Sequence, residues 1–130
     1  MARFQKGTLV LAAVVSIFVI AAVALYKYAV DSPWRVSSEV AKQKIAAHEI
    51  DVVLDVRTDF ERETLGFLPN SVHIQSADLE KEMGRLYPDK KTRIVAYCNT
   101  GHRARLATDK LHALGYKNAV YITGGYKTLQ

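Results

Sequence analysis

An uncharged apolar stretch near the N-terminus, residues 7–26, limits most strongly what this chain can fold into. No charged residue lies between Lys6 and Lys27. About twenty residues of helix, rising about 1.5 Å each, cover the roughly 30 Å hydrocarbon core of a membrane. A chain of 130 residues could hardly bury a helix that is apolar all round. We therefore interpret residues 1–30 as a single-pass transmembrane anchor that meets the membrane through residues 7–26.

A cleaved secretory signal peptide is the alternative, because Arg3 and Lys6 resemble its basic start and residues 22–24 its small-residue cleavage site. The apolar stretch is longer than the usual core of a signal peptide, which favours an anchor. More positive charges flank the C-terminal side of the stretch, which predicts that the following domain is cytoplasmic. A lone thiol is also kept reduced more easily in the cytosol. A periplasmic or other extracytoplasmic location stays open. The C-terminal flank carries Lys27, Arg35, Lys42 and Lys44.

Residues 31–130 predict one α/β domain. Short apolar runs alternate with segments of helical periodicity, a pattern typical of a mainly parallel sheet with helices on both faces. We expect a five-stranded sheet. The expected strands are residues 34–36, 52–56, 72–74, 94–97 and 119–122, and the expected helices are residues 38–48, 58–64, 78–86 and 103–114.

Composition excludes several classes of function. Three of the 18 basic residues lie in the first 30 positions and all 13 acidic residues lie beyond them, which leaves 15 basic against 13 acidic side chains in the domain. Binding of nucleic acid needs a concentrated basic face, so we expect no such partner. The single cysteine excludes an internal disulfide. His73 and His112 lack the spacing of metal ligands, and we expect neither a metal nor another cofactor.

The only cysteine, Cys98, lies in a loop between an expected strand, residues 94–97, and an expected helix, residues 103–114. Backbone N–H groups at such a turn, together with the helix dipole, attract an anion and favour the thiolate form of a cysteine. Gly101 permits backbone angles that side chains disfavour. Arg103 adds a permanent positive charge. The loop therefore predicts a nucleophilic Cys98 assisted by Arg103.

The run from Cys98 to Arg103 resembles the active-site loop Cys-x-x-Gly-x-Arg of the rhodanese-like sulfurtransferases. Three further segments, in the same order as in the family, support the resemblance. Residues 55–61 are similar to its Asp-Val-Arg-x-x-x-Glu signature, residues 66–74 to its Gly-His-Ile-Pro-Gly-Ala segment, and residues 121–126 to its closing Leu-x-Gly-Gly-aromatic motif. The resemblance covers the whole domain and implies a rhodanese-like fold.

The resemblance also implies an activity. A sulfane sulfur would move from a small donor, such as thiosulfate or a persulfide, through a Cys98 persulfide to an acceptor, which could be cyanide, a thiol or a protein. Arg103 would orient an anionic donor or anchor the loop through a carboxylate, for which we expect Asp55. We expect Arg57 to support the site and to pair with Glu61, four residues on. The loop residues expected to bind substrate are Asn99, Thr100, Gly101, His102 and Ala104.

Three alternatives remain. Protein tyrosine phosphatases use a loop one residue longer, Cys-x5-Arg, so the Cys-x4-Arg spacing favours sulfur transfer over phosphate hydrolysis. A membrane-tethered module could bind a sulfur carrier or a protein without turnover, and Cys98 could act in redox sensing.

The family pattern is also broken at two positions: Phe67 replaces the usual histidine, and Asn70 replaces a glycine but still tolerates a left-handed turn.

Overall fold

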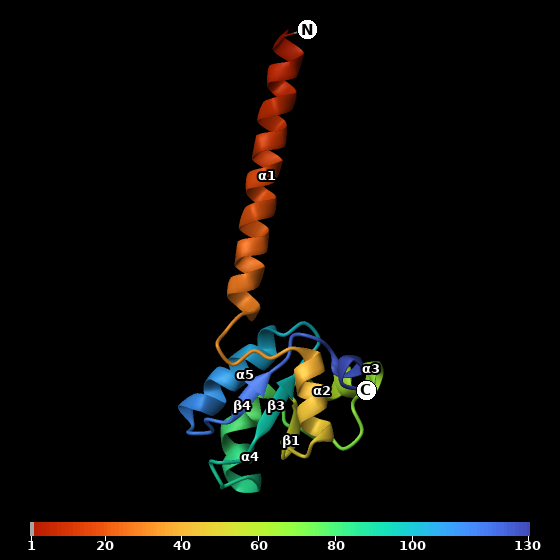
Figure 1. Cartoon of the computed structure of the whole chain (residues 1–130), viewed down its shortest axis with the longest axis vertical. Helices are drawn as coiled ribbons and strands as arrows, with labels where there is room; N and C mark the ends of the chain where they lie inside the picture. The colour runs from red at the N-terminus through yellow and green to blue at the C-terminus, as the bar shows by residue number, and fades with distance from the viewer. Residues whose placement is uncertain (1) are drawn as a thin grey trace. The chain divides into compact units, whose positions relative to one another are not determined.

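The computed structural model describes residues 2–130, and the chain divides into two units, the first ending at Asp31 and the second comprising Ser32–Gln130. The first unit is a single helix, α1 (Ala2–Val30) (Figure 1). Its 26-residue segment Gln5–Val30 is long and apolar enough to cross a membrane, and none of its most apolar part is buried. A signal sequence near the N-terminus can meet the same criteria of length and apolar composition.

The second unit is built on a parallel sheet of four strands, β1 (Val52–Asp55), β2 (Val72–His73), β3 (Ile94–Tyr97) and β4 (Ala119–Tyr121), in the order β2-β1-β3-β4. Figure 1 labels β1, β3 and β4. The predicted α/β fold with a parallel sheet is confirmed. The expected fifth strand at residues 34–36 is wrong, because this segment forms only an isolated parallel bridge between Arg35 and Tyr121. Ser37 caps the next helix directly afterwards, so no length is left for a strand.

Helices cover both faces of the sheet, as predicted. On one face, α2 (Ser38–Ala46) and the short 3-10 helix η2 (Tyr126–Leu129) pack against each other, and Ala41 and Leu129 meet sheet residues such as Val95. On the other face lie α4 (Leu79–Leu86), which follows the 3-10 turn η1 (Ser76–Asp78), and α5 (His102–Ala113). Burial on both faces explains why β3 has no polar alternation: all four of its residues are buried.

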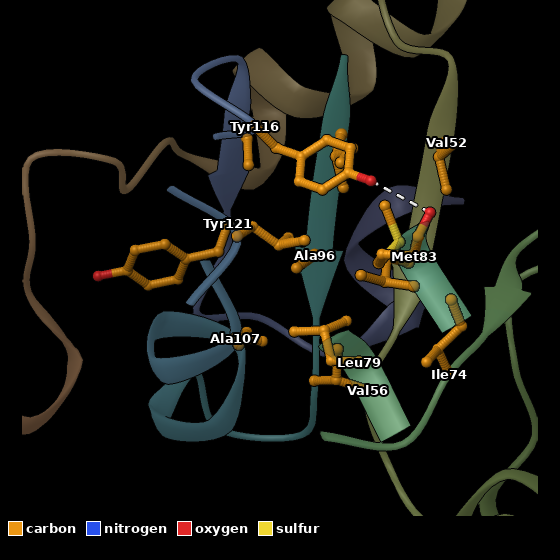
Figure 2. Close-up of a cluster of buried hydrophobic side chains, with 14 of the residues drawn as sticks. Val52, Val56, Ile74, Leu79, Met83, Ala96, Ala107, Tyr116 and Tyr121 are labelled. Atoms are coloured by element: carbon orange, nitrogen blue, oxygen red, sulfur yellow. Dashed lines mark hydrogen bonds between the residues drawn. The ribbon is translucent and has the colours of Figure 1, made fainter. Parts of the chain in front are cut away.

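The larger core lies between the sheet, α4 and α5 (Figure 2). It includes one polar anchor: the buried Tyr116 hydroxyl donates to the backbone oxygens of Tyr87 at 2.6 Å and Met83 at 3.1 Å. This contact ties the segment after α5 to the end of α4. The labelled members of this core are Val52, Val56, Ile74, Leu79, Met83, Ala96, Ala107, Tyr116 and Tyr121.

Helix α3 (Asp59–Leu65) begins with a capping box that fixes the direction of one acidic side chain. Thr58 Oγ1 accepts a hydrogen bond from the Glu61 N–H at 3.2 Å, and the Glu61 carboxylate accepts one from the Thr58 N–H at 2.9 Å. This reciprocal pair turns the Glu61 side chain back toward the end of β1 rather than outward into solvent.

Candidate active site

The strand order places the candidate site between β1 and β3. The connection that leaves β1 leads to β2 on one side of β1, whereas the connection that leaves β3 leads to β4 on the opposite side of the sheet. The two connections therefore diverge at the carboxyl ends of β1 and β3. In open α/β sheets this divergence opens a crevice in which ligands bind. Residues 56–58 leave β1 at this edge, and the loop that begins with Cys98 leaves β3 beside them, since Asp55 and Tyr97 are register partners.

Cys98 lies at the base of the predicted loop, immediately before α5. Its sulfur accepts a hydrogen bond from the Gly101 N–H at 3.0 Å. The residue is only 1% exposed and packs with the core beside Val56 and Ala104, so it is more enclosed than a freely accessible nucleophile. The first N–H groups of α5, those of residues 102–104, belong to the same turn and have no acceptor within the helix. The expected thiolate state of Cys98 stays a prediction.

Gly101 is the N-cap of α5 and has the left-handed backbone that the sequence predicts, with φ of 98°. A side chain at this position would also collide with the following turn, because a β-carbon would lie 2.8 Å from the Thr123 α-carbon. Both restrictions require glycine. The loop is therefore packed directly against the residues that follow β4.

Arg103 is anchored through a carboxylate, but the partner is Glu61 and not Asp55. Arg103 Nη1 donates to Glu61 Oε2 at 2.6 Å, and Nη2 donates to Oε1 at 2.7 Å. This two-pronged ion pair is the geometry that a guanidinium and a carboxylate form best. It lowers the pKa of Glu61 to about 2 and raises the pKa of Arg103, in each case chiefly through the hydrogen bonds between them. The expectation that Asp55 holds Arg103 is wrong.

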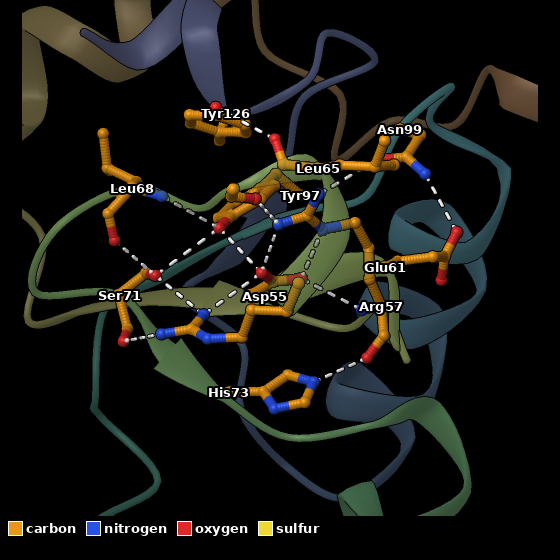
Figure 3. A network of polar contacts seen from close by, with 12 residues as sticks. Asp55, Arg57, Glu61, Leu65, Leu68, Ser71, His73, Tyr97, Asn99 and Tyr126 are labelled. Carbon is orange, nitrogen blue, oxygen red and sulfur yellow. Dashed lines mark hydrogen bonds and ion pairs between the residues drawn. The ribbon is translucent and has the colours of Figure 1, made fainter. Parts of the chain in front are cut away.

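Asp55 instead forms the centre of a buried network under the loop (Figure 3). Its Oδ1 accepts from the Arg57 N–H and Nε, both at 3.0 Å, and its Oδ2 accepts from Arg57 Nη2 at 2.8 Å, the Tyr97 hydroxyl at 2.8 Å and Arg62 Nη1 at 3.1 Å. Burial by itself would raise the pKa of Asp55, but the bonds from Arg57 and Tyr97 outweigh it and hold the pKa below its usual value. The carboxylate is therefore ionised in the folded protein.

Arg57 supports the loop but does not pair with Glu61, so that prediction is also wrong. Besides its bonds to Asp55, it donates to the Gly66 backbone oxygen at 2.7 Å and to Asn99 Oδ1 at 3.3 Å. The Asn99 amide in turn donates to Glu61 Oε1 at 2.9 Å (Figure 3). Asn99, at one end of the loop, is thus held from two sides.

The remaining expected site residues differ in position. Thr100 and His102 are exposed on the loop, whereas Ala104 is buried beneath it in the core. The Ala104 side chain therefore packs against the interior, and only its backbone could meet a ligand. Among residues 2–130, no group of three or more His, Cys, Asp or Glu side chains is placed to hold a metal ion.

Sequence reasoning missed three contributors to this site: Arg62, Ser71 and Tyr97. Arg62 Nη1 donates to Ser71 Oγ at 3.0 Å as well as to Asp55, and its guanidinium lies 3.8 Å from the centre of the Phe67 ring. Phe67, one of the departures from the family pattern, therefore packs on an arginine of the network. The other, Asn70, has the left-handed backbone expected of it, with φ of 66°. No spacing in the sequence pairs these side chains.

Comparisons with known proteins identify the family of the second unit. A family model described as the rhodanese-like domain matches residues 37–130. YtwF of Bacillus subtilis (strain 168), a candidate sulfurtransferase by name, is 34% identical over 90 residues, which cover 69% of this chain and 84% of that protein. The rhodanese domain-containing protein CG4456 of Drosophila melanogaster is 29% identical over 85 residues, covering 57% of this chain and 77% of that protein.

A solved structure gives the same result in three dimensions. The human single-domain sulfurtransferase TSTD1 superposes with a TM-score of 0.60 at 25% identity, covering 75% of this chain and 95% of that one. Sequence and fold therefore agree over the second unit of the chain. The chain belongs to the rhodanese-like family, whose general chemistry among these relatives is sulfur transfer.

Proposed function

We propose that this protein is a membrane-anchored sulfurtransferase in which Cys98 carries the transferred sulfur. The observation that carries the proposal is the hydrogen bond from the Gly101 N–H to the Cys98 sulfur at 3.0 Å, in a turn that opens α5. A backbone N–H pointed at sulfur stabilises a thiolate and, after reaction, the anion of a persulfide. Because Cys98 is enclosed, only a narrow group, such as the terminal sulfur of a donor, can come close enough for its sulfur to attack.

The reaction is a double displacement. The Cys98 thiolate attacks the outer sulfur of the donor, a new sulfur–sulfur bond forms, and the donor's own bond to that sulfur breaks. Thiosulfate leaves as sulfite, whereas a persulfide leaves as a thiol after taking up the proton of its terminal sulfur. An acceptor then attacks the outer sulfur of the Cys98 persulfide and restores the thiolate. Cyanide would yield thiocyanate, and a thiol on a small molecule or a protein would yield its persulfide.

The experiment is intact-mass analysis of the purified full-length protein in detergent after treatment with thiosulfate or polysulfide. We expect a mass gain of one sulfur atom that disappears on addition of cyanide and is absent from Cys98→Ser. Unmodified protein with every donor would contradict the proposal and favour a module that binds without turnover. Release of phosphate from an aryl phosphate at a comparable rate would favour the phosphatase alternative.

Membrane anchoring through residues 7–26 is a separate part of the proposal, supported by the length and apolar composition of α1. We expect the protein to remain with membranes after alkaline carbonate extraction and to keep its N-terminal residues in the intact mass. Loss of residues 1–24 would indicate a cleaved signal peptide. Protease digestion of sealed vesicles of known orientation tests the proposed cytoplasmic domain: in right-side-out vesicles residues 32–130 should be protected.

A further inference from the structure

The Glu61 carboxylate connects three parts of the candidate site. It accepts hydrogen bonds from the N-cap of α3 at Thr58, from Asn99 at one end of the Cys98 loop, and from both terminal nitrogens of Arg103 at the other end. The Glu61 side chain is 23% exposed and that of Arg103 is 36% exposed. The ion pair therefore lies at the border between the loop and solvent, where an arriving substrate would meet it.

This pairing changes the charge that the loop presents. Arg103 is the permanent cation within the loop, and both its terminal nitrogens already bind a carboxylate. Arg57, which contacts the loop through Asn99, is likewise paired with Asp55 at 2.8 Å. Arg103 therefore offers no uncompensated positive charge to a substrate, and Arg57, although it shares Asp55 with Arg62, is buried. A donor with two negative charges must therefore displace Glu61 from Arg103, or approach the loop while the Glu61 carboxylate repels it.

A small cavity lies beside Arg103, and Cys98 is not among its lining residues. Its volume is about 190 Å³, below the roughly 300 Å³ of the smallest usual ligand pockets. Arg103 is the only charged residue in its wall; the other lining residues are Val56, Thr58, Gln75, Ser76 and Ala77. Thiosulfate is the smaller of the two donors compared below, so the size of this cavity does not select against it and the selection of a donor rests on charge.

We propose that Glu61 determines donor specificity by neutralising Arg103, so that the site uses short organic persulfides in preference to the dianion thiosulfate. The inference rests on the proposed sulfur transfer through Cys98. In the preferred reaction a Cys98–sulfur bond forms, the sulfur–sulfur bond of the persulfide breaks, and the organic thiolate takes the proton of the terminal sulfur and leaves as a thiol. Glu61 is a positioning residue in this scheme, because it acts through Arg103 and Asn99.

The test compares two donors in the full-length protein, thiosulfate and cysteine persulfide, by the initial rate of sulfur gain on Cys98. Glu61→Gln keeps the size of the side chain and its capping role but removes its charge. We expect the ratio of its second-order rate constants for thiosulfate and cysteine persulfide to rise about tenfold over that of the wild type, equivalent to about 1.4 kcal/mol. The thiosulfate rate should also become more sensitive to salt, since Arg103 then acts as an uncompensated charge.

Glu63→Gln is the matched control, because Glu63 lies on the same helix and is exposed, and within residues 2–130 no hydrogen bond or ion pair joins its side chain to the loop. Its donor ratio should equal that of the wild type. An equal fall with both donors in Glu61→Gln, or an unchanged ratio, would overturn the inference and leave Glu61 as a structural brace. Absence of sulfur gain in the wild type with either donor would instead overturn the proposed function.

A second variant decides the question if Glu61→Gln does not fold. Arg103→Gln leaves the Glu61 carboxylate without its cation, so the loop becomes more negative. We expect the thiosulfate rate to fall about tenfold further than the cysteine persulfide rate. Equal losses with both donors would contradict charge selection.

Discussion

Replacing Asp55 with asparagine tests whether the buried network supports the fold from beneath the loop of residues 98–103. The carboxylate accepts five hydrogen bonds, from Arg57, Arg62 and the Tyr97 hydroxyl, and is itself 0% exposed. Arg57 is 1% exposed, so its charge cannot be solvated once the carboxylate is lost. An asparagine could keep some hydrogen bonds but would leave two guanidinium groups without a negative partner.

Removing one partner of a buried ion pair costs about 3–5 kcal/mol. We expect Asp55→Asn to lose about this much free energy of unfolding, a large fraction of the roughly 5–15 kcal/mol of a typical domain. With a urea dependence of about 2 kcal/mol/M, the unfolding midpoint should fall by about 2 M. Trp34, the only tryptophan, stacks on His112 with ring centres 3.9 Å apart, so its fluorescence reports unfolding of the domain in the full-length protein in detergent.

Asp51→Asn is the matched control, because Asp51 pairs with Arg93 just as closely, at 2.7 Å, but at the surface, where the two side chains are 41% and 44% exposed. An exposed ion pair contributes about 0–1 kcal/mol. If Asp55→Asn were no less stable than Asp51→Asn, the network would not support the fold and the reasoning from burial would be wrong.

Three other substitutions give further predictions. Gly101→Ala should lower stability by about 2–4 kcal/mol in urea unfolding, because the left-handed backbone and the contact with Thr123 both oppose a β-carbon; a loss under 1 kcal/mol would contradict this. Glu61, with its pKa lowered from 4.5 to about 2, stabilises the fold above about pH 4.5 and loses that effect as the pH falls toward 2. Glu61→Gln should therefore lose less stability than the wild type between about pH 5 and pH 3, measured by the same unfolding; an equal loss would show that the ion pair does not contribute. Tyr116→Phe should cost about 0.5–1.5 kcal/mol, since it removes two hydrogen bonds to backbone oxygens; an unchanged midpoint would refute it.

The sequence predicted the elements whose signals are local. The apolar run at residues 94–97 is β3, and the helix expected at residues 58–64 is α3, which Thr58 caps. The prediction of a fifth strand was wrong because the strand propensity of residues 34–36 does not say where the next helix begins. Ser37 already caps α2, and Pro33 on the other side has no N–H to pair with a neighbouring strand. Only the bridge at Arg35 fits between them.

The pairing of charges at the site was harder to predict. A spacing of four residues pairs Arg57 with Glu61 only if both lie on one helix, and Arg57 precedes the N-cap of α3. It lies in the bend after β1, where its side chain returns to Asp55 two residues before it. The pattern Thr58-x-x-Glu61 was the available signal for the true arrangement, because a capping box directs the third residue of a helix back toward its N-terminus.

The two carboxylates of the site therefore have different consequences for function, although each binds guanidinium groups. Asp55 is wholly buried, so no substrate can reach it, and its pairing with Arg57 is a fixed part of the fold. Glu61 and Arg103 lie at the border with solvent, where a substrate anion can compete for the guanidinium. A change of charge at Asp55 should therefore lower the stability of the domain and affect the rates with all donors equally. A change of charge at Glu61 should instead alter the ratio of the rates with different donors. This contrast separates support of the loop from selection of its substrate.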